Sequence, residues 1–176
     1  LAEAAGSLAA DVRFEQGDVR SLAFPDGMFD LALTTRVIIN LHDRETQLQG
    51  VRECLRVVRP GGVALLSEAT TQGLDRINAL RAELGMTPLP MPGFNLYLDV
   101  EELRAWDLGC ETRMEVIDFS STYYLLTRVF KPIMAQLPGS LVRAADPESE
   151  LNRLAGVLPS WGDYGVQKLI VIRKGA

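Results

Sequence analysis

The chain has 176 residues, 18 basic and 23 acidic side chains, and a formal net charge of −5. This balance argues against broad binding to nucleic-acid phosphates, which requires a basic face. Two cysteines and one histidine are too few for a disulfide framework or a Cys/His zinc site. The sequence has no secretory signal and no apolar run near the roughly 20 residues of a membrane-spanning helix. We therefore expect a cytoplasmic protein without nucleic-acid, membrane or metal partners.

The first sixty residues combine strand-like and helix-like patterns. Residues 1–9 are rich in helix formers, Val12–Glu15 alternates apolar and polar side chains, and Phe29–Thr35 is largely apolar. A helix follows, with Asp43 as its predicted N-cap. Its apolar face carries Leu48, Val51, Leu55 and Val58. Pro60 and the two glycines after it are expected to end this helix.

The rest of the chain continues the alternation. Val63–Ser67 has the apolar character of a strand covered on both faces. An amphipathic helix over Gly73–Gly85 leads to a proline-dense connector, Thr87–Phe94, and Asp99 can cap a further helix. The remaining predicted elements are a strand over Met114–Phe119, a helix from Thr122 to about Phe130, a helix from about Pro147 to Val157, and a strand over Gly165–Arg173.

This order of elements predicts one domain over residues 1–176 with an α/β fold, a three-layer sandwich around a mostly parallel sheet. In such sheets ligands bind at the carboxyl ends of the strands.

Three sequence blocks occur in an informative order. Phe14–Val19 ends in Gly-Asp-Val, Phe24–Leu31 is a turn feeding a strand, and Glu53–Gly62 is a helix ending in Arg-Pro-Gly-Gly. Together, over roughly residues 10–68, they resemble the middle and C-terminal motifs of class I S-adenosylmethionine-dependent methyltransferases. The resemblance implies the seven-stranded, Rossmann-like fold of that family and S-adenosylmethionine as cofactor.

The same resemblance assigns roles to individual residues. Asp18 would accept a hydrogen bond from the adenine amino group, and the backbone of Val19 would read the adjacent ring nitrogen. Thr34, Thr35 and Arg36 would border the methionine part of the cofactor.

The sequence also departs from the family pattern. No two glycines are spaced as Gly-x-Gly, and only eleven residues precede Val12, whereas a strand–helix–strand unit takes about 30. The first two strands of the family fold therefore have no counterpart, and the chain is expected to be N-terminally incomplete. An exposed sheet edge would favour pairing with another chain, so a homo-oligomer stays open.

Polar and aromatic side chains in the later loops are candidates for binding a small-molecule acceptor. They are Asn40, Asn95, Tyr97, Tyr123, Tyr124, Arg128, Trp161 and Tyr164. His42 and Asp163 are the candidate general bases for a hydroxyl acceptor.

We expect methyl transfer to a small molecule by in-line displacement. The alternatives are a methyltransferase-fold module that binds no cofactor by itself and a nicotinamide-dependent dehydrogenase, although the sequence lacks a dinucleotide fingerprint.

Overall fold

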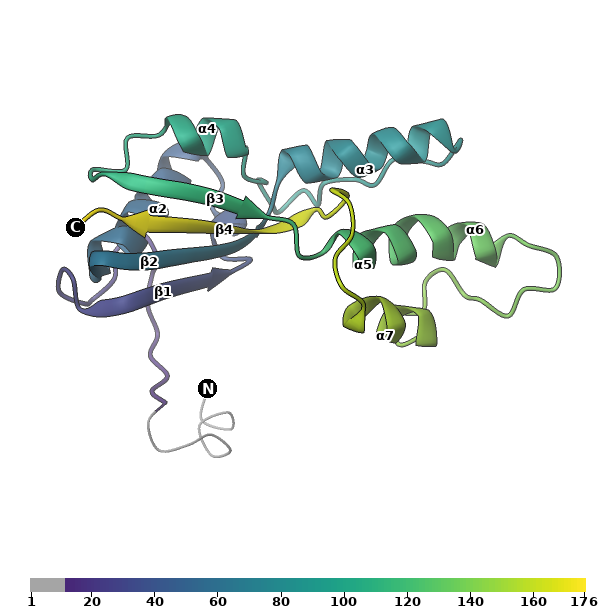
Figure 1. The fold of residues 1–176 in the computed structure, drawn as a ribbon, viewed down its shortest axis with the longest axis horizontal. Coiled ribbons are helices and arrows are strands. Elements are labelled where there is room, and N and C mark those ends of the chain that lie inside the picture. The colour runs from purple at the N-terminus through teal and green to yellow at the C-terminus, as the bar shows by residue number, and fades with distance from the viewer. Residues whose placement is uncertain (1–11) are drawn as a thin grey trace.

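The structure is a computed structural model that describes residues 12–176, so the helix expected over residues 1–9 lies outside the described part. Four strands form one sheet in the order β1–β2–β4–β3 (Figure 1). Their bounds are Phe29–Thr35 for β1, Val58–Ala69 for β2, Thr112–Ile117 for β3 and Gln167–Lys174 for β4. β1 and β2 run parallel, whereas β4 is antiparallel to both of its neighbours. The described sheet is therefore mixed, and β1, β2 and β3 all end on the same side.

Helices surround this sheet and form the connections between its first three strands. They are the 3-10 helix η1 (Ile38–Asn40), α2 (Arg44–Val57), α3 (Thr71–Glu83) and α4 (Val100–Ala105). The predicted N-caps are confirmed, because Asp43 accepts a hydrogen bond from the N–H of Thr46 at 2.8 Å and Asp99 accepts from Glu102 at 3.0 Å. Within residues 12–176, none of the helices has the length and apolar content needed to cross a bilayer.

A second group of helices projects beyond the side of the sheet where β1 and β3 end (Figure 1). We call it the helical extension; it comprises α5 (Ser121–Leu125), the π-helix η2 (Leu126–Phe130), α6 (Lys131–Ala135) and α7 (Glu150–Val157). The helix expected to end near Phe130 continues to Ala135 because Pro132 falls in the first turn of α6, where proline is tolerated. The π turn before it is a further local adjustment.

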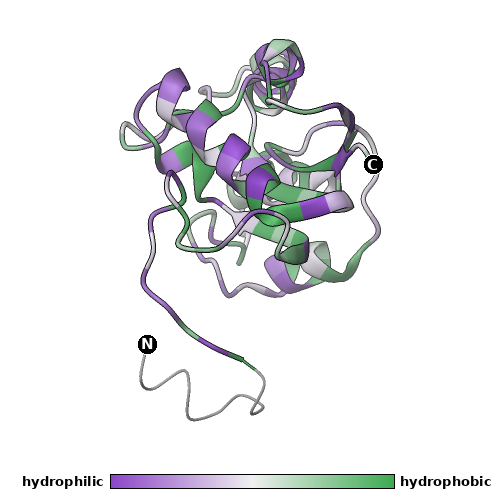
Figure 2. Ribbon diagram, turned by 90° about the vertical axis from the view of Figure 1, so that its left-hand side faces the viewer, coloured by the Kyte–Doolittle hydropathy of each residue, from purple (hydrophilic) through white to green (hydrophobic). Residues whose placement is uncertain are grey.

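The core lies between the sheet and the helices around it. Ile38, Leu66, Ile77, Leu103 and Ile170 are all fully buried there. Figure 2 shows apolar segments along the sheet and hydrophilic stretches on the helices around it. Strand and helix periodicities therefore bury one common apolar core.

Two local expectations are wrong. Residues 12–15 form no strand and are exposed, because no strand of the described chain lies beside them to complete a ladder. The Pro60 segment is not a separate turn after the helix, since β2 begins at Val58. Gly62 permits this, because an added Cβ there would lie 2.7 Å from the carbonyl oxygen of Asp30 in the neighbouring strand.

Candidate functional site

The chain takes an unusual backbone shape just after β1. Arg36 has φ of 54° and is the one non-glycine residue of the described chain with a positive φ. Such a conformation costs about 1–3 kcal/mol and persists only where other contacts hold it. The N–H of Arg36 donates to the carbonyl of Ser67 at 2.9 Å, and its carbonyl accepts from the side-chain amide of Asn40 at 2.5 Å. We call the segment Arg36–Asn40, at the carboxyl ends of β1 and β2, the β1 turn.

A buried carboxylate fastens the β1 turn to β2. Glu68 is fully buried and accepts hydrogen bonds from the hydroxyl of Thr34 at 2.9 Å and from the N–H of Val37 at 3.0 Å. The N–H groups of Ile38 and Ile39 also point at this carboxylate. Burial raises the pKa of Glu68, and the four donors oppose that shift. The hydroxyl of Thr34, a predicted cofactor contact, is therefore already engaged in holding the turn.

Asp18 and Val19 line an open hollow of about 670 Å³ against one side of the β1 turn. Its other lining residues are Gln16, Gly17, Val37, Asn40 and Leu41. The guanidinium of Arg20 donates a hydrogen bond to the carboxylate of Asp18, with 2.6 Å between Nη2 and Oδ2. This hydrogen bond lowers the pKa of Asp18 to about 2. Asp18 is therefore an anion at neutral pH, and a carboxylate with its several lone pairs can still accept from a further donor.

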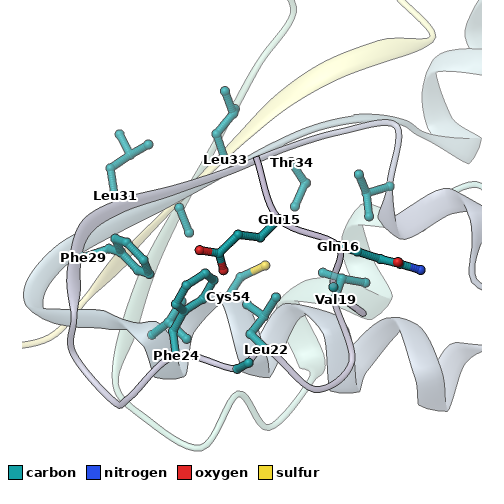
Figure 3. A pocket seen from close by; sticks show the side chains of 15 residues that line it. Glu15, Gln16, Val19, Leu22, Phe24, Phe29, Leu31, Leu33, Thr34 and Cys54 are labelled. Atoms are coloured by element: carbon teal, nitrogen blue, oxygen red, sulfur yellow. The ribbon is translucent and has the colours of Figure 1, made fainter. Parts of the chain in front are cut away.

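A neighbouring hollow of about 440 Å³ shares Gly17, Val19 and Val37 with the first (Figure 3). It runs along the edge of β1 that faces away from β2, where no strand of the described chain pairs. Its walls are largely apolar, and the rings of Phe24 and Phe29 meet edge to face with centroids 5.0 Å apart. Cys54 points into it, but burial raises the pKa of this thiol to about 11, so it is no nucleophile at neutral pH.

Arg36 of the β1 turn also lines a basic pocket of about 210 Å³, which we call the arginine pocket. Arg36, Tyr97, Tyr124 and Arg128 supply its polar groups. Its apolar walls are Leu74, Leu89, Pro90, Pro92 and Val166. Burial raises the pKa of both tyrosines, and the charge of Arg36 partly offsets this. The sequence predicted Tyr97, Tyr124 and Arg128 as acceptor contacts and Arg36 as a cofactor contact, and the fold brings all four to one pocket.

Two asparagines continue this polar region. Asn95 is 7% exposed, and its amide donates to the Oδ1 of Asn40 at 2.6 Å. The Oδ1 of Asn95 is buried without a hydrogen-bond partner among residues 12–176. This leaves one unused acceptor close to the β1 turn.

Other predicted site residues lie elsewhere. Tyr123 lines a separate hollow with residues of α7, and the side chain of Trp161 is 75% exposed. Tyr164 packs against the core, while Thr35 and His42 are exposed. None of these five residues lines the arginine pocket or the hollow at Asp18.

Asp163 belongs to an ion-pair network at the base of the helical extension. Its carboxylate contacts the Nζ of Lys168 and lies 3.2 Å from Arg76, and Lys168 also pairs with Asp118 at 3.1 Å. The hydrogen bond from Lys168 lowers the pKa of Asp163, which makes it a weak base.

Two residues of the site were missed from the sequence. Glu68 is the one charged residue in an otherwise apolar or small stretch, Val63–Ala69, and that polar break was the available signal. Arg81 is 8% exposed and donates to the carbonyls of Thr87 and Arg128, so it braces the arginine pocket from behind. Nothing in the sequence pattern of α3 pointed to this role.

The residues at the hollow beside Asp18 fit the adenine end of S-adenosylmethionine. An ionised acceptor, Asp18, stands next to the apolar side chains of Val19, Val37 and Leu41, which suit a flat aromatic ring. Residues 12–176 contain no glycine-rich loop for the rest of that molecule. Within the same residues, no group of three metal-ligating side chains occurs.

Comparisons with known proteins bear on the family. A family model described as a methyltransferase domain matches residues 1–66. A demethylmenaquinone methyltransferase of Mycolicibacterium vanbaalenii is 34% identical over 110 residues, which cover 58% of this chain and 46% of that protein. Norajmaline N-methyltransferase of Rauvolfia serpentina is 40% identical over 70 residues, 39% of this chain and 23% of that protein. The chain thus spans about half or less of the length of these relatives.

Solved structures bear on the fold. A SAM-dependent methyltransferase from Mesorhizobium loti aligns with a TM-score of 0.55 and 16% identity, covering 97% of this chain and 73% of that one. A putative methyltransferase of Haloferax volcanii, solved with its Trm112 activator, gives a TM-score of 0.54 and 16% identity, covering 98% and 66%. The Rossmann-like fold and the family resemblance expected from the sequence are confirmed.

Proposed function

We propose that this protein, which resembles the class I S-adenosylmethionine-dependent methyltransferases, transfers a methyl group from S-adenosylmethionine to a small molecule. One observation carries the proposal. Residues of the β1 turn line both cavities: Val37 and Asn40 line the hollow at Asp18, and Arg36 lines the arginine pocket. A cofactor and an acceptor can therefore meet at the carboxyl ends of β1 and β2.

Methyl transfer requires mainly that the acceptor atom be positioned in line with the methyl group. S-adenosylmethionine supplies an electrophilic methyl group on a sulfonium, with a neutral thioether as the leaving group. The protein side chains need to hold the acceptor atom in line, which converts a bimolecular step into a nearly unimolecular one. Asp18 and Val19 would bind the adenine, and Arg36, Tyr97 and Tyr124 would hold the acceptor.

A hydroxyl acceptor would also need a base. Asp163 is the poorer candidate, because Lys168 and Arg76 stabilise its ionised form. His42 is the better one, because it makes no ion pair within residues 12–176 and follows the β1 turn by two residues, just before the N-cap of α2.

The small size of the arginine pocket and the acidic charge of the chain support a metabolite over a nucleic acid as substrate. We also propose the cytoplasmic location that was expected from the sequence. The two relatives named above act, by their names, on demethylmenaquinone and on norajmaline.

Calorimetric titration of S-adenosylhomocysteine into the 176-residue chain tests the proposal. We expect saturable binding that weakens about tenfold in Asp18→Ala, the loss of one charge-assisted hydrogen bond. Asp30→Ala is the matched control, since Asp30 is an exposed aspartate paired with Arg59 at 2.6 Å outside the hollow. No binding to the folded chain, as judged by circular dichroism, would instead favour a module that binds no cofactor by itself.

A further inference from the structure

We infer that the methyl acceptor is a small carboxylic acid with an apolar body, whose carboxylate binds Arg36 and Arg128 in the arginine pocket. The inference rests on the proposed function and specifies the substrate class of the same site. It comes from the pairing of charges, the state of the tyrosine hydroxyls, and the size and lining of the pocket.

The charges at the pocket are not compensated. Among residues 12–176, no carboxylate lies within ion-pair distance of Arg36 or Arg128, whereas Arg44, Arg56 and Arg76 all have acidic partners. Arg81 adds a third guanidinium, which donates to the backbone carbonyl of Arg128 and lacks a carboxylate partner as well. In a chain with a net charge of −5, three neighbouring arginines without an acid form a local positive field.

The hydroxyls of the pocket are available. Tyr97 is 7% exposed, and neither its hydroxyl nor that of Tyr124 makes a hydrogen bond within the described chain. Both phenols stay protonated at neutral pH because burial raises their pKa values. Each can therefore donate a hydrogen bond to an anion, and two guanidinium groups with two phenols match the four lone-pair sites of one carboxylate.

The apolar walls of the arginine pocket determine which kind of anion it can bind. Leucine, proline and valine side chains form the remaining walls, so the part of the ligand next to the charged group must be apolar. A volume of about 210 Å³ holds a ring or a short chain and excludes a nucleotide or a folded peptide. A carboxylate is a monoanion at neutral pH and loses less hydration on entering such a site than a phosphate dianion does.

The backbone at Arg36 supports a binding role for its side chain. Its positive φ is maintained by Ser67, Asn40 and the Glu68 brace, and strain of this kind concentrates at ligand sites. The same turn places Val37 and Asn40 at the hollow beside Asp18, so an acid held by Arg36 lies next to the proposed cofactor site.

Benzoate and its neutral isostere benzamide are suitable probes, measured by ligand-observed NMR on the 176-residue chain without cofactor. We expect benzoate to bind at least tenfold more tightly than benzamide, since the two differ in the charge that the arginines recognise. Arg128→Gln should abolish this preference. Arg113→Gln, which removes another exposed arginine, on β3, should leave it unchanged.

Two further measurements keep the inference separate from the cofactor site. Tyr97→Phe should weaken benzoate binding a few-fold without changing benzamide binding, because it removes one hydroxyl donor. Benzoate should also bind in the presence of saturating S-adenosylhomocysteine. Equal affinity for the two probes, equal losses in Arg128→Gln and Arg113→Gln, or displacement of benzoate by S-adenosylhomocysteine would each overturn the inference. A chain that selects benzoate but binds no S-adenosylhomocysteine would keep the acid site and refute the cofactor proposal.

Discussion

The sheet region and the helical extension treat their apolar side chains differently. In the sheet region, Leu66 and Ile170 are fully buried in a core cluster that also contains residues of α2 and η1. In the helical extension and its loops, Phe130, Val157 and Leu141 are 52%, 80% and 97% exposed. The hydrophobic contribution to stability therefore concentrates in the sheet region, because it scales with the apolar area removed from water.

The helical extension is anchored to the core by the buried side chains of Leu125 and Val129, and polar contacts hold much of the rest. Lys131 of α6 donates to the Oδ1 of Asn152 in α7 at 2.8 Å, and Ser121 and Thr122 of α5 bond the backbone of the loop before β4. The arginine pocket takes Arg36 from the sheet region and Arg128 from the extension. Ligand binding there would couple a rigid region to one whose local stability is lower.

The largest contrast is expected from leucine truncation. Leu66→Ala should lower the free energy of unfolding by about 4 kcal/mol, because it leaves a cavity where the leucine side chain was fully buried. Leu141→Ala, at a side chain that is already exposed, should change it by less than about 0.5 kcal/mol. Urea denaturation followed by circular dichroism measures both. Similar losses would mean that the extension is packed as tightly as the sheet.

Breaking the ion-pair network between the two regions should cause the second-largest loss of stability. The side chains of Lys168 and Asp118 are 8% and 9% exposed and pair at 3.1 Å, so Lys168→Met leaves a buried carboxylate without its cation. We expect a loss of about 3 kcal/mol in the free energy of unfolding. Arg153→Met, which breaks an exposed pair with Glu150, is the control and should cost less than about 0.5 kcal/mol.

Two glycine substitutions should change the free energy of unfolding in opposite directions. An added Cβ at Gly73 would lie 2.3 Å from the carbonyl oxygen of Gly165, so Gly73→Ala must push α3 away from the start of β4. We expect a loss of about 2 kcal/mol, as for overpacked cores. Gly156 of α7 has open space around it, and Gly156→Ala should stabilise the protein by about 0.5 kcal/mol through helix propensity. Melting temperatures should move in opposite directions; a drop in both would show that α7 is not a free helix face.

The smallest expected effect is a pH-dependent change in stability at Asp163. Lys168 lowers the pKa of Asp163 in the folded state below its ordinary value near 3.8, so folding favours the ionised carboxylate. The stability it contributes is present above pH 4 and is lost as the pH falls through the lowered pKa. Asp163→Asn should therefore be less stable than wild type by under about 1 kcal/mol at pH 6, and this difference should shrink as the pH falls below 4. A difference that persists unchanged at pH 2 would contradict the ion pair as its cause.

Much of the sheet region could be read from the sequence. The run Phe29–Thr35 is β1 as predicted, and the apolar stripe through Val51 and Leu55 is the buried face of α2. These elements follow local rules of side-chain spacing and capping that a short segment carries by itself. Val12–Glu15 alternates apolar and polar side chains as a strand would, yet it forms no strand, since a strand also requires a neighbour to bond with.

The site was predictable in its members and not in their grouping. Tyr97, Tyr124 and Arg128 were candidates because of their chemistry, as Tyr123, Trp161 and Tyr164 were. The fold places the first three beside Arg36 and the others outside the pocket.

The sequence by itself determined the order of strands and helices, the N-caps at Asp43 and Asp99, and the types of side chain available for binding. Only the tertiary structure decided that Glu68 would hold the β1 turn and that Arg36 would meet Arg128. The reason is physical. Spacing and capping act over a few residues, whereas a charge left without a partner is defined by everything that packs around it, and those neighbours come from every part of the chain.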